Sequence, residues 1–299
     1  MRTVFDWNIG SRSLALGKRT LVMGVVNVTP DSFSDGGDFL DPEKAVEHAL
    51  RLLDDGAEVI DVGGESTRPG ARVNPSTTGK AADTCKPVSE KEERDRVLPV
   101  IANLKQKRPN AIISIDTYKA SVARAAVEAG AEVVNDISAF RWDPKMAKTV
   151  AELKCGAVLM HMRGRPEEWR KLPPVADIVM LVKRELRDWA DAAMMAGVKR
   201  ERIVIDPGFG FGKNFEDNYP LLRRLDEFHQ LRYPLLAGVS RKSFIGRMLK
   251  RDGKDAAIPD RAYGTVAAET AAILKGVHII RTHDVRACVD AARVADIVA

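Results

Sequence analysis

Eight apolar segments of strand length each end at a polar residue that a buried strand does not require. These polar residues are Asn27, Asp61, Asp116, Asn135, His161, Asp206, Ser240 and Arg281. Parallel strands that are covered on both faces read as nearly continuous runs of Val, Ile and Leu, so a polar residue at the end of each run is informative. Carboxylates, amides and cations gathered in one place could recognise the N–H and C=O groups of a polar heterocycle.

The segments that carry these residues predict an eightfold alternation of strand and helix. The strand-like runs cover 20–28, 59–62, 111–115, 133–135, 156–160, 203–205, 234–239 and 277–280. No linker rich in Pro, Gly or Ser divides them, which favours one α/β domain over residues 1–299, a (β/α)8 TIM barrel with its core at about 20–298 and a short N-terminal arm. A doubly wound open sheet is the alternative. In a closed barrel, the C-terminal strand ends form the active site.

Composition excludes several classes of protein. The chain has 299 residues, 45% of them apolar, and no segment approaches the roughly 20 apolar residues of a membrane span. The N-terminus lacks the apolar core of an export signal, and the three cysteines lack metal-ligand spacing, so we expect reduced thiols in a cytoplasmic protein. The net charge of +5 is spread along the chain, which favours small anionic ligands over a nucleic acid.

The loops that follow the first two predicted strands carry further polar groups. The loop 27–37 (NVTPDSFSDGG) combines an amide, carboxylates, hydroxyls and Phe33, a mixture that suits a mobile loop closing over a ligand. In the second loop, Asp61 and Glu65 could equally bind a ligand or orient other groups. The following segment 71–87 is polar, lacks periodicity and is long for a connection between a strand and a helix, so it is either a lid or a disordered insertion.

The later loops predict a site for an anion. Ser240, Lys242 and Ser243 lie where a strand meets a helix, and Arg281 and His283 lie before the last helix. Barrels often bind phosphate in the loops after strands seven and eight, and helix N-termini favour anions.

Two further segments are open to more than one interpretation. The glycine-rich loop 206–213 (DPGFGFGK) does not match a nucleotide-binding register, so we expect Phe209 and Phe211 to fold over the barrel mouth and Lys213 to be a solvated cation. His161 has no second histidine at metal-ligand spacing, and we interpret it as a rim or packing residue. Met160 could lie against an aromatic ligand or fill the core.

Taken together, these motifs resemble those of the dihydropteroate synthase family. The resemblance rests on NVTPDSFSDGG at 27–37, ESTRPG at 65–70, SRKSFIG at 240–246 and the segments 114–117, 135–138, 206–212 and 281–285. These motifs occur in the family's order, and the similarity runs from about Leu21 to Ala292. The insertion 71–87 departs from the family pattern, in which a helix follows the second loop quickly.

The resemblance implies that the protein joins (7,8-dihydropterin-6-yl)methyl diphosphate to 4-aminobenzoate with Mg²⁺, forming 7,8-dihydropteroate and diphosphate in folate synthesis. The implied pterin-binding residues are Asp116, Asn135, Met160, Asp206 and Lys242. The implied diphosphate residues are Asn27, Arg281 and His283, with Asn27 also a ligand of Mg²⁺; Thr67 and Ser243 lie near the diphosphate and the second substrate. Phe33, Arg68 and Pro69 match loops that close over the aminobenzoate, where sulfonamides compete. A homodimer is implied by the family alone.

The chemistry that the resemblance implies needs no activated side-chain nucleophile. Loss of diphosphate leaves a cation that the pterin ring can delocalise, so the protein must neutralise the leaving group and exclude water. Asn27, Lys242, Arg281 and His283 are the residues expected to act on the reacting groups. A methyltetrahydrofolate-binding methyltransferase domain and a catalytically silent pterin-binding paralogue are the alternatives. The first would need neither an anion site after the eighth strand nor the motif that begins at Asn27. The second would be favoured by loss of Asn27, Arg281 or the first loop, and all three are present.

Overall fold

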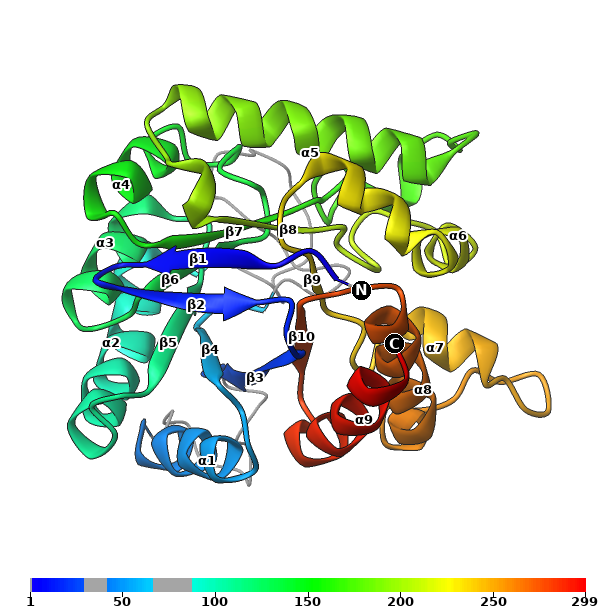
Figure 1. The fold of residues 1–299 in the computed structure, drawn as a ribbon, viewed down its shortest axis with the longest axis horizontal. Coiled ribbons are helices and arrows are strands. Elements are labelled where there is room, and N and C mark those ends of the chain that lie inside the picture. The colour runs from blue at the N-terminus through cyan, green and yellow to red at the C-terminus, as the bar shows by residue number, and fades with distance from the viewer. Residues whose placement is uncertain (1, 30–41, 67–87) are drawn as a thin grey trace.

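The computed structural model describes residues 2–29, 42–66 and 88–299, which form a barrel of parallel strands surrounded by helices (Figure 1). Its strands are β1 (Phe5–Ile9), β2 (Arg12–Leu16), β3 (Leu21–Asn27), β4 (Val59–Gly63), β5 (Ile112–Asp116), β6 (Val133–Asp136), β7 (Gly156–Met160), β8 (Ile203–Asp206), β9 (Leu236–Ala237) and β10 (Ile279–Thr282). Its helices are α1 (Pro42–Asp54), α2 (Glu90–Lys107), α3 (Ala120–Glu128), α4 (Met146–Leu153), α5 (Ile178–Met195), α6 (Asn218–Arg223), α7 (Ser243–Met248), α8 (Ala262–Leu274) and α9 (Val285–Val298).

The eight parallel strands follow one another around the barrel in the order β8-β7-β6-β5-β4-β3-β10-β9. A parallel bridge between Ile205 and Leu235 joins the two ends of this order, so the sheet closes on itself. The predicted (β/α)8 barrel is therefore confirmed over the open-sheet alternative. The strand predicted at 234–239 is much shorter than expected, because regular pairing is confined to Leu236 and Ala237.

Side chains alternate between the inside of the barrel and the helices that surround it, because successive residues of a strand point to opposite faces. On β3, Leu21 and Met23 belong to the apolar cluster inside the barrel, whereas Val22 and Val26 pack with the helices. The inside cluster consists of Trp7, Ile9, Leu16, Leu21, Met23, Val59, Ile112, Val133, Val158, Val204, Leu236 and Ile279. These residues come from the hairpin and from the N-terminal half of each strand, so the apolar filling occupies one end of the barrel.

The N-terminal segment, expected only as a short arm, forms the antiparallel hairpin β1–β2 across this end (Figure 1). Trp7, Ile9 and Leu16 are fully buried against the inside cluster. The Trp7 indole N–H donates a hydrogen bond to the Arg202 carbonyl oxygen at 2.9 Å, which satisfies its one polar group. The hairpin therefore closes the N-terminal end of the barrel with apolar side chains.

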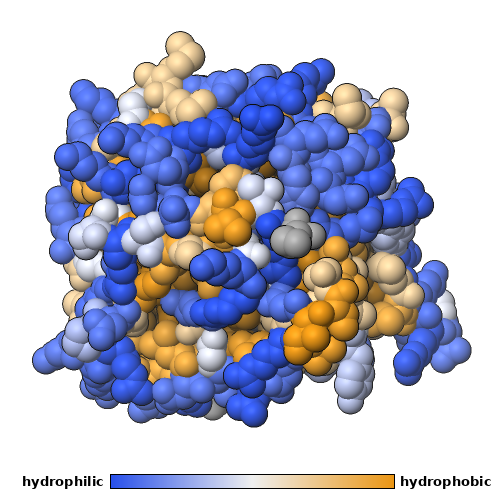
Figure 2. Space-filling model, in the orientation of Figure 1, coloured by the Kyte–Doolittle hydropathy of each residue, from blue (hydrophilic) through white to orange (hydrophobic). Residues whose placement is uncertain are grey.

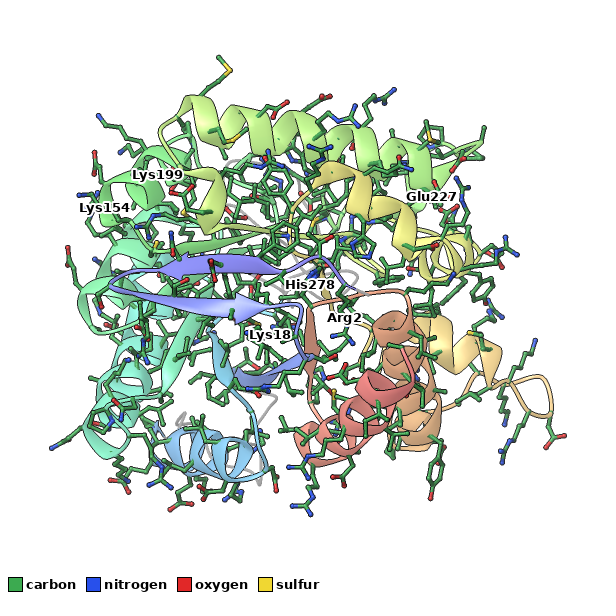
Figure 3. The ribbon with its side chains drawn as sticks, viewed as in Figure 1. Arg2, Lys18, Lys154, Lys199, Glu227 and His278 are labelled. Carbon is green, nitrogen blue, oxygen red and sulfur yellow. The ribbon has the colours of Figure 1, made fainter. Side chains whose placement is uncertain are left out.

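Figure 3 shows Arg2, Lys18 and His278 next to the hairpin. His278 is buried beside it, and its Nε2 lies 3.0 Å from the Thr3 carbonyl oxygen. Arg2 forms ion pairs with Asp296 near the C-terminus, so the two ends of the chain lie together. The opposite end of the barrel is consequently the one that is open for binding.

Helix α5 illustrates how sequence determines a covering helix. The Asp177 side chain caps its N-terminus by accepting hydrogen bonds from the amides of Val179 (2.9 Å) and Met180 (3.1 Å). Val182, Leu186 and Ala193 recur at helical spacing and are buried against the barrel. Glu185 and Trp189 of the same helix contact His161, the residue that follows β7.

Candidate active site

A pocket of about 620 Å³ opens at the C-terminal end of the barrel, a size that suits a small organic ligand. Nine of the site residues that the family resemblance implies line it: Asn27, Asp116, Asn135, Met160, Asp206, Lys242, Ser243, Arg281 and His283. They come from six of the eight barrel strands and from the loops that follow β9 and β10. The expected convergence at one mouth is therefore observed. Within the described part of the chain, no group of three His, Cys, Asp or Glu side chains could hold a metal ion by itself.

A buried ion-pair network forms the floor of the pocket. Arg281 donates from Nε to Asp61 Oδ2 at 2.6 Å and from Nη2 to Asp116 Oδ2 at 2.8 Å. Asn135 Nδ2 donates to the same Asp61 oxygen at 3.0 Å. Asp61 is fully buried, so it acts by orienting Arg281 and Asn135, one of the two roles that its position allowed. Arg281 lies within β10 rather than after it, and the strand fixes its direction.

Burial changes the protonation of the carboxyl groups in this pocket. Burial raises the pKa of Asp116 to about 7, against the opposing effect of Arg281 and with a further contribution from Asp61. Burial also raises the pKa of Asp206 to about 6, although a hydrogen bond from the Gly208 amide and the charge of Lys242 lower it. Both groups can therefore exchange a proton close to neutral pH. Such perturbed carboxyls are typical of functional sites.

One side of the pocket presents hydrogen-bonding groups next to flat apolar surfaces. Asp206 Oδ1 accepts a hydrogen bond from the Gly208 amide at 2.7 Å, and no described residue donates to its Oδ2. The Lys242 ammonium lies 3.9 Å from the centre of the Phe211 ring. Met160 contributes to the neighbouring apolar cluster with Ile137. This side can hold a flat heterocycle by its edge and cover its faces. Phe211 lines the pocket, as predicted, whereas Phe209 does not fold over the mouth: it is buried in the apolar core, where its ring stacks on Phe244.

The other side of the pocket carries hydroxyl and basic groups. His283 Nδ1 lies 3.1 Å from Ser240 Oγ, and the His283 amide donates to the same oxygen at 3.2 Å. Burial and the nearby Arg281 lower the pKa of His283 to about 3, so the ring is neutral while the pocket is empty of anions. Arg241 also lines this side, where its Nε bonds Asp284 Oδ2 at 3.1 Å. A polyanion placed here would meet donors and cations together.

The structure contradicts the prediction for Lys213 and decides between the two interpretations of His161. Lys213 is not a solvated cation: it is 8% exposed, and its ammonium is surrounded by acceptors from the protein. His161 is fully buried and faces α5, where its ring stacks on Trp189 and its Nε2 lies 3.0 Å from Glu185 Oε2. Strand alternation explains this, because Met160 points into the barrel and the next residue must point outward. His161 is therefore a packing residue.

The second loop is anchored at its base by residues that sequence reasoning did not identify. The Lys119 ammonium donates to Glu65 Oε2 at 2.7 Å and to the Val88 carbonyl oxygen at 2.8 Å, and it also pairs with Glu93. Glu65 thus has an orienting role, the second of the possibilities that its position allowed. A buried lysine preceding a helix gives no signal in one sequence, which is why Lys119 was missed.

Several predicted site residues lie outside the described residues. These are Phe33, Thr67, Arg68 and Pro69, together with the whole segment 71–87. The roles expected for them stay predictions.

Comparisons with known proteins agree with this geometry. Residues 23–283 match the model of a family described as "Pterin binding enzyme". The chain is 42% identical over 296 residues to dihydropteroate synthase of Synechocystis, an alignment that covers 99% of this chain and 92% of that protein. It resembles the solved structure of Xanthomonas albilineans dihydropteroate synthase with 4-aminobenzoic acid, with a TM-score of 0.86, 43% identity and coverage of 99% and 98%. A second structure of that enzyme, in complex with 7,8-dihydropteroate, gives a TM-score of 0.80 and 41% identity, covering 95% of each chain.

Proposed function

The chain belongs to the dihydropteroate synthase family of pterin-binding enzymes, and we propose that the pocket at the barrel mouth is where it carries out that reaction. The enzyme transfers a pterinylmethyl group from (7,8-dihydropterin-6-yl)methyl diphosphate to 4-aminobenzoate. The products are 7,8-dihydropteroate, a precursor in folate biosynthesis, and diphosphate. The observation that carries the assignment of the site is that one pocket unites Asp116, Asn135, Asp206, Lys242 and Arg281, which lie in different motifs along the chain.

The pterin subsite is the half of the pocket that contains Asp206. Its free Oδ2 can accept the paired N–H groups of an aminopyrimidinone ring, provided that the carboxyl is ionised. Asn135 is held by Asp61 through its Nδ2, so its carbonyl oxygen remains available to a ligand. Lys242 can donate to a ring acceptor, and Met160 and Phe211 cover the ring. Asp116 serves mainly to hold Arg281, and its contact with the pterin is part of the proposal.

The diphosphate subsite is the half that contains Arg281, His283 and Ser243. Arg281 uses Nε and Nη2 for the two carboxylates, and its Nη1 makes no hydrogen bond to a described residue, so this nitrogen can bind the leaving group. A bound diphosphate would favour the charged form of His283 and raise its pKa from the low value of the empty pocket.

The reaction follows from these two halves. The C–O bond between the pterin methylene carbon and diphosphate breaks, and its electron pair leaves with the diphosphate. The dihydropterin ring delocalises the positive charge that remains on the carbon. The amino nitrogen of 4-aminobenzoate then forms the new C–N bond and loses a proton to water. The residues of the site bind, orient and neutralise charge, and none of them needs to act as a nucleophile.

We propose Asn27 as the protein ligand for Mg²⁺. Its side-chain amide lines the pocket and makes no hydrogen bond to any other described residue, so its oxygen is available. Mg²⁺ typically takes only one or two protein oxygens and completes its shell with water and phosphate oxygens, which agrees with the absence of a larger cluster among described residues. When bound, the ion neutralises charge on the departing diphosphate. We expect Asn27→Ala to remove the Mg²⁺ dependence of diphosphate binding in calorimetry.

We further propose that the protein is a homodimer in the cytoplasm. Helices α8 and α9 expose Tyr263 (91%), Ile297 (85%), Val298 (68%) and Val294 (66%), and Figure 2 shows apolar surface over α9. Apolar groups of this kind support a contact with a second copy. The described cysteines, Cys155 and Cys288, are free and buried, which is consistent with a reducing compartment. No helix among the described residues is long and apolar enough to cross a membrane.

The experiment that tests the function is incubation of the purified protein with both substrates and Mg²⁺. We expect dihydropteroate and diphosphate to appear in equal amounts. Release of diphosphate without dihydropteroate would mean that water, not the arylamine, takes the pterinylmethyl group. If neither product formed although the pterin bound, the catalytically silent paralogue would be the correct interpretation.

A further inference from the structure

The glycine-rich loop 206–213 lies backbone to backbone on the segment that leaves β7. A Cβ atom on Gly208 would lie 1.9 Å from the His161 carbonyl oxygen, and one on Gly212 would lie 2.0 Å from the Arg163 carbonyl oxygen. Both glycines also have positive φ angles, +66° and +65°. The glycines are therefore needed for close contact between two backbones, and the loop has little freedom to change its position.

The buried ammonium of Lys213 donates hydrogen bonds to both of the segments that meet here. Its Nζ lies 2.8 Å from the Gly208 carbonyl oxygen and 3.2 Å from that of Phe211, both within the loop. It also lies 3.2 Å from the His161 carbonyl oxygen and 2.9 Å from His161 Nδ1, across the contact. An ammonium has three N–H donors, so all of them are used within the protein.

The partner of Lys213 is itself held in one protonation state. Because the ammonium can only donate, His161 Nδ1 must carry the lone pair, and its proton must be on Nε2, which faces Glu185 Oε2 at 3.0 Å. Burial and the charge of Lys213 lower the pKa of His161 well below its usual range, so the ring is neutral. Stacking on Trp189, with ring centres 5.0 Å apart, fixes the ring plane. Helix α5 thus determines where Lys213 sits.

The same loop carries two groups that face the pterin subsite, Asp206 at its start and Phe211 near its end. The positive charge of Lys213 also acts on Asp206 and lowers the pKa of that carboxyl group. Phe211 packs against the apolar cluster that contains Met160 of β7, and Lys213 adds hydrogen bonds that join the loop to the end of that strand. A change at Lys213 would therefore alter both the position and the charge of the acceptor.

Resting on the proposed function, we infer that Lys213 is a positioning residue for the pterin subsite. It holds the 206–213 loop against the end of β7 through the Gly208 carbonyl oxygen, and the amide of the same Gly208 donates to Asp206 Oδ1. Lys242 lines the pocket, whereas Lys213 does not, so one lysine meets the ligand and the other acts through the loop.

This arrangement predicts a pH dependence that a purely structural lysine would not produce. The charged groups that act on Asp206 are Lys242, Lys213 and Arg281, and those that act on Lys213 are Asp206, Lys242, Asp217 and Glu185. Burial lowers the pKa of Lys213 to about 7, so this lysine is charged at about pH 6, where Asp206 takes up its proton. Pterin binding needs the ionised carboxylate of Asp206, so affinity falls as the pH drops through that value. Asp116, with a pKa of about 7, titrates in the wild type and in the variant alike. Without the Lys213 charge, the carboxyl takes up its proton at higher pH, and the fall in affinity begins about one pH unit earlier.

The test measures binding of 7,8-dihydropterin by calorimetry between pH 5 and pH 8 for the wild-type protein and Lys213→Met. We expect the variant to bind about tenfold or more weakly at pH 7, with the midpoint of its acid limb moved upward. Its KM for 4-aminobenzoate stays close to that of the wild type. Lys183→Met is the matched control. Lys183 is a buried lysine on α5, it donates to Gln230 Oε1 at 2.8 Å, and it does not line the pocket. This control loses thermal stability without moving the midpoint.

Two further measurements keep the inference falsifiable. If Lys213→Met does not fold, Lys213→Gln provides the same pH measurement, because it keeps N–H donors without the charge. Wild-type affinity in either variant, or weaker binding with an unmoved midpoint, would overturn the role of Lys213. Failure of the wild-type protein to bind dihydropterin at any pH would instead refute the proposed function, so the two failures are distinguishable.

Discussion

The inward-facing residues of the barrel strands are apolar at one end and charged or polar at the other. At the N-terminal end, Leu21 on β3 and Ile279 on β10 pack with Trp7 of the hairpin, away from water. Two to six residues further along the same strands, Asn27 and Arg281 line the open pocket. One backbone scaffold therefore provides a closed apolar end and an open polar end, and strand alternation keeps both on the inside.

The two ends of the barrel contribute to stability in opposite ways. Burial of apolar side chains stabilises the closed end by roughly 25 cal/mol for each Å² removed from water. At the open end, burial of Asp116 and Asp206 raises their pKa values, which means that ionising them costs the folded state free energy. The open end thus costs stability where it prepares a ligand site.

Arg281 is expected to be an exception to this difference between the two ends, because it lies at the open end and yet stabilises the fold. Arg281→Ala leaves the fully buried Asp61 without its cation, which typically costs about 3–5 kcal/mol. We also expect the rate of diphosphate release to fall about a thousandfold, because a donor to the leaving group is lost. Chemical denaturation and single-turnover kinetics measure the two effects. Arg286→Ala, which changes an exposed arginine of α9, is the control and leaves both unchanged. A wild-type rate in Arg281→Ala would remove Arg281 from the diphosphate subsite.

Asp206 lies at the open end, and we expect its replacement to affect ligand binding and not stability. Asp206→Ala removes the acceptor for the ring N–H groups and weakens dihydropterin binding about a hundredfold or more. Unfolding free energy changes little, because loss of the hydrogen bond from the Gly208 amide is offset by removal of a carboxyl group whose ionisation is made costly by burial. Calorimetry and urea denaturation on one sample check both statements. Unchanged affinity would refute the assignment of the pterin subsite.

Trp7 is the corresponding test at the closed end. Trp7→Ala removes a fully buried indole and its hydrogen bond to Arg202, and we expect a loss of about 3 kcal/mol or more in stability. Pterin affinity, measured well below the unfolding temperature, stays at the wild-type value. Trp7→Phe should recover part of the stability. A loss of affinity in the folded Trp7→Ala protein would show that the two ends are coupled.

The pH dependence of stability is the smallest of the expected effects, and it has opposite signs at the two ends. Burial lowers the pKa of His278, beside the hairpin, to about 4, so its contribution is lost as the pH falls from about 6.5 towards 4. The raised pKa of Asp206 means that stability is lost as the pH rises from about 4 through 6. We expect the unfolding free energy of Asp206→Asn to rise by on the order of 2 kcal/mol relative to the wild type across that pH range. We expect the unfolding free energy of His278→Gln to approach that of the wild type as the pH falls. Denaturation series at several pH values measure both slopes, and a pH-independent difference would contradict either sign.

Much of the barrel could be predicted from the sequence, because long apolar runs and helical spacing are dominated by burial. The eight strands and the residues of the mouth followed from this pattern. Pro234 to Val239 reads as a full strand, but regular pairing is limited to two residues. The hairpin was not predicted, because two five-residue strands in a polar segment give a weak alternating signal.

The interactions that link the predicted residues could not be read from one sequence. The pairing of Arg281 with Asp61 joins residues 220 positions apart, and such distance leaves no local pattern. Lys213 looked like a solvated cation because a lysine after a glycine loop usually is one. Only the acceptors brought by β7 and by the loop itself reveal that it is buried. Long-range polar contacts are thus the part of the site that needs coordinates.

A crystal structure of the protein with bound 7,8-dihydropterin shows directly where the substrate lies. We expect the ring in the mouth pocket, with its N–H groups within hydrogen-bond distance of Asp206 Oδ2 and with Lys242 and Phe211 alongside. A ring bound elsewhere on the barrel, or bound in the pocket without contact to Asp206, would contradict this expectation.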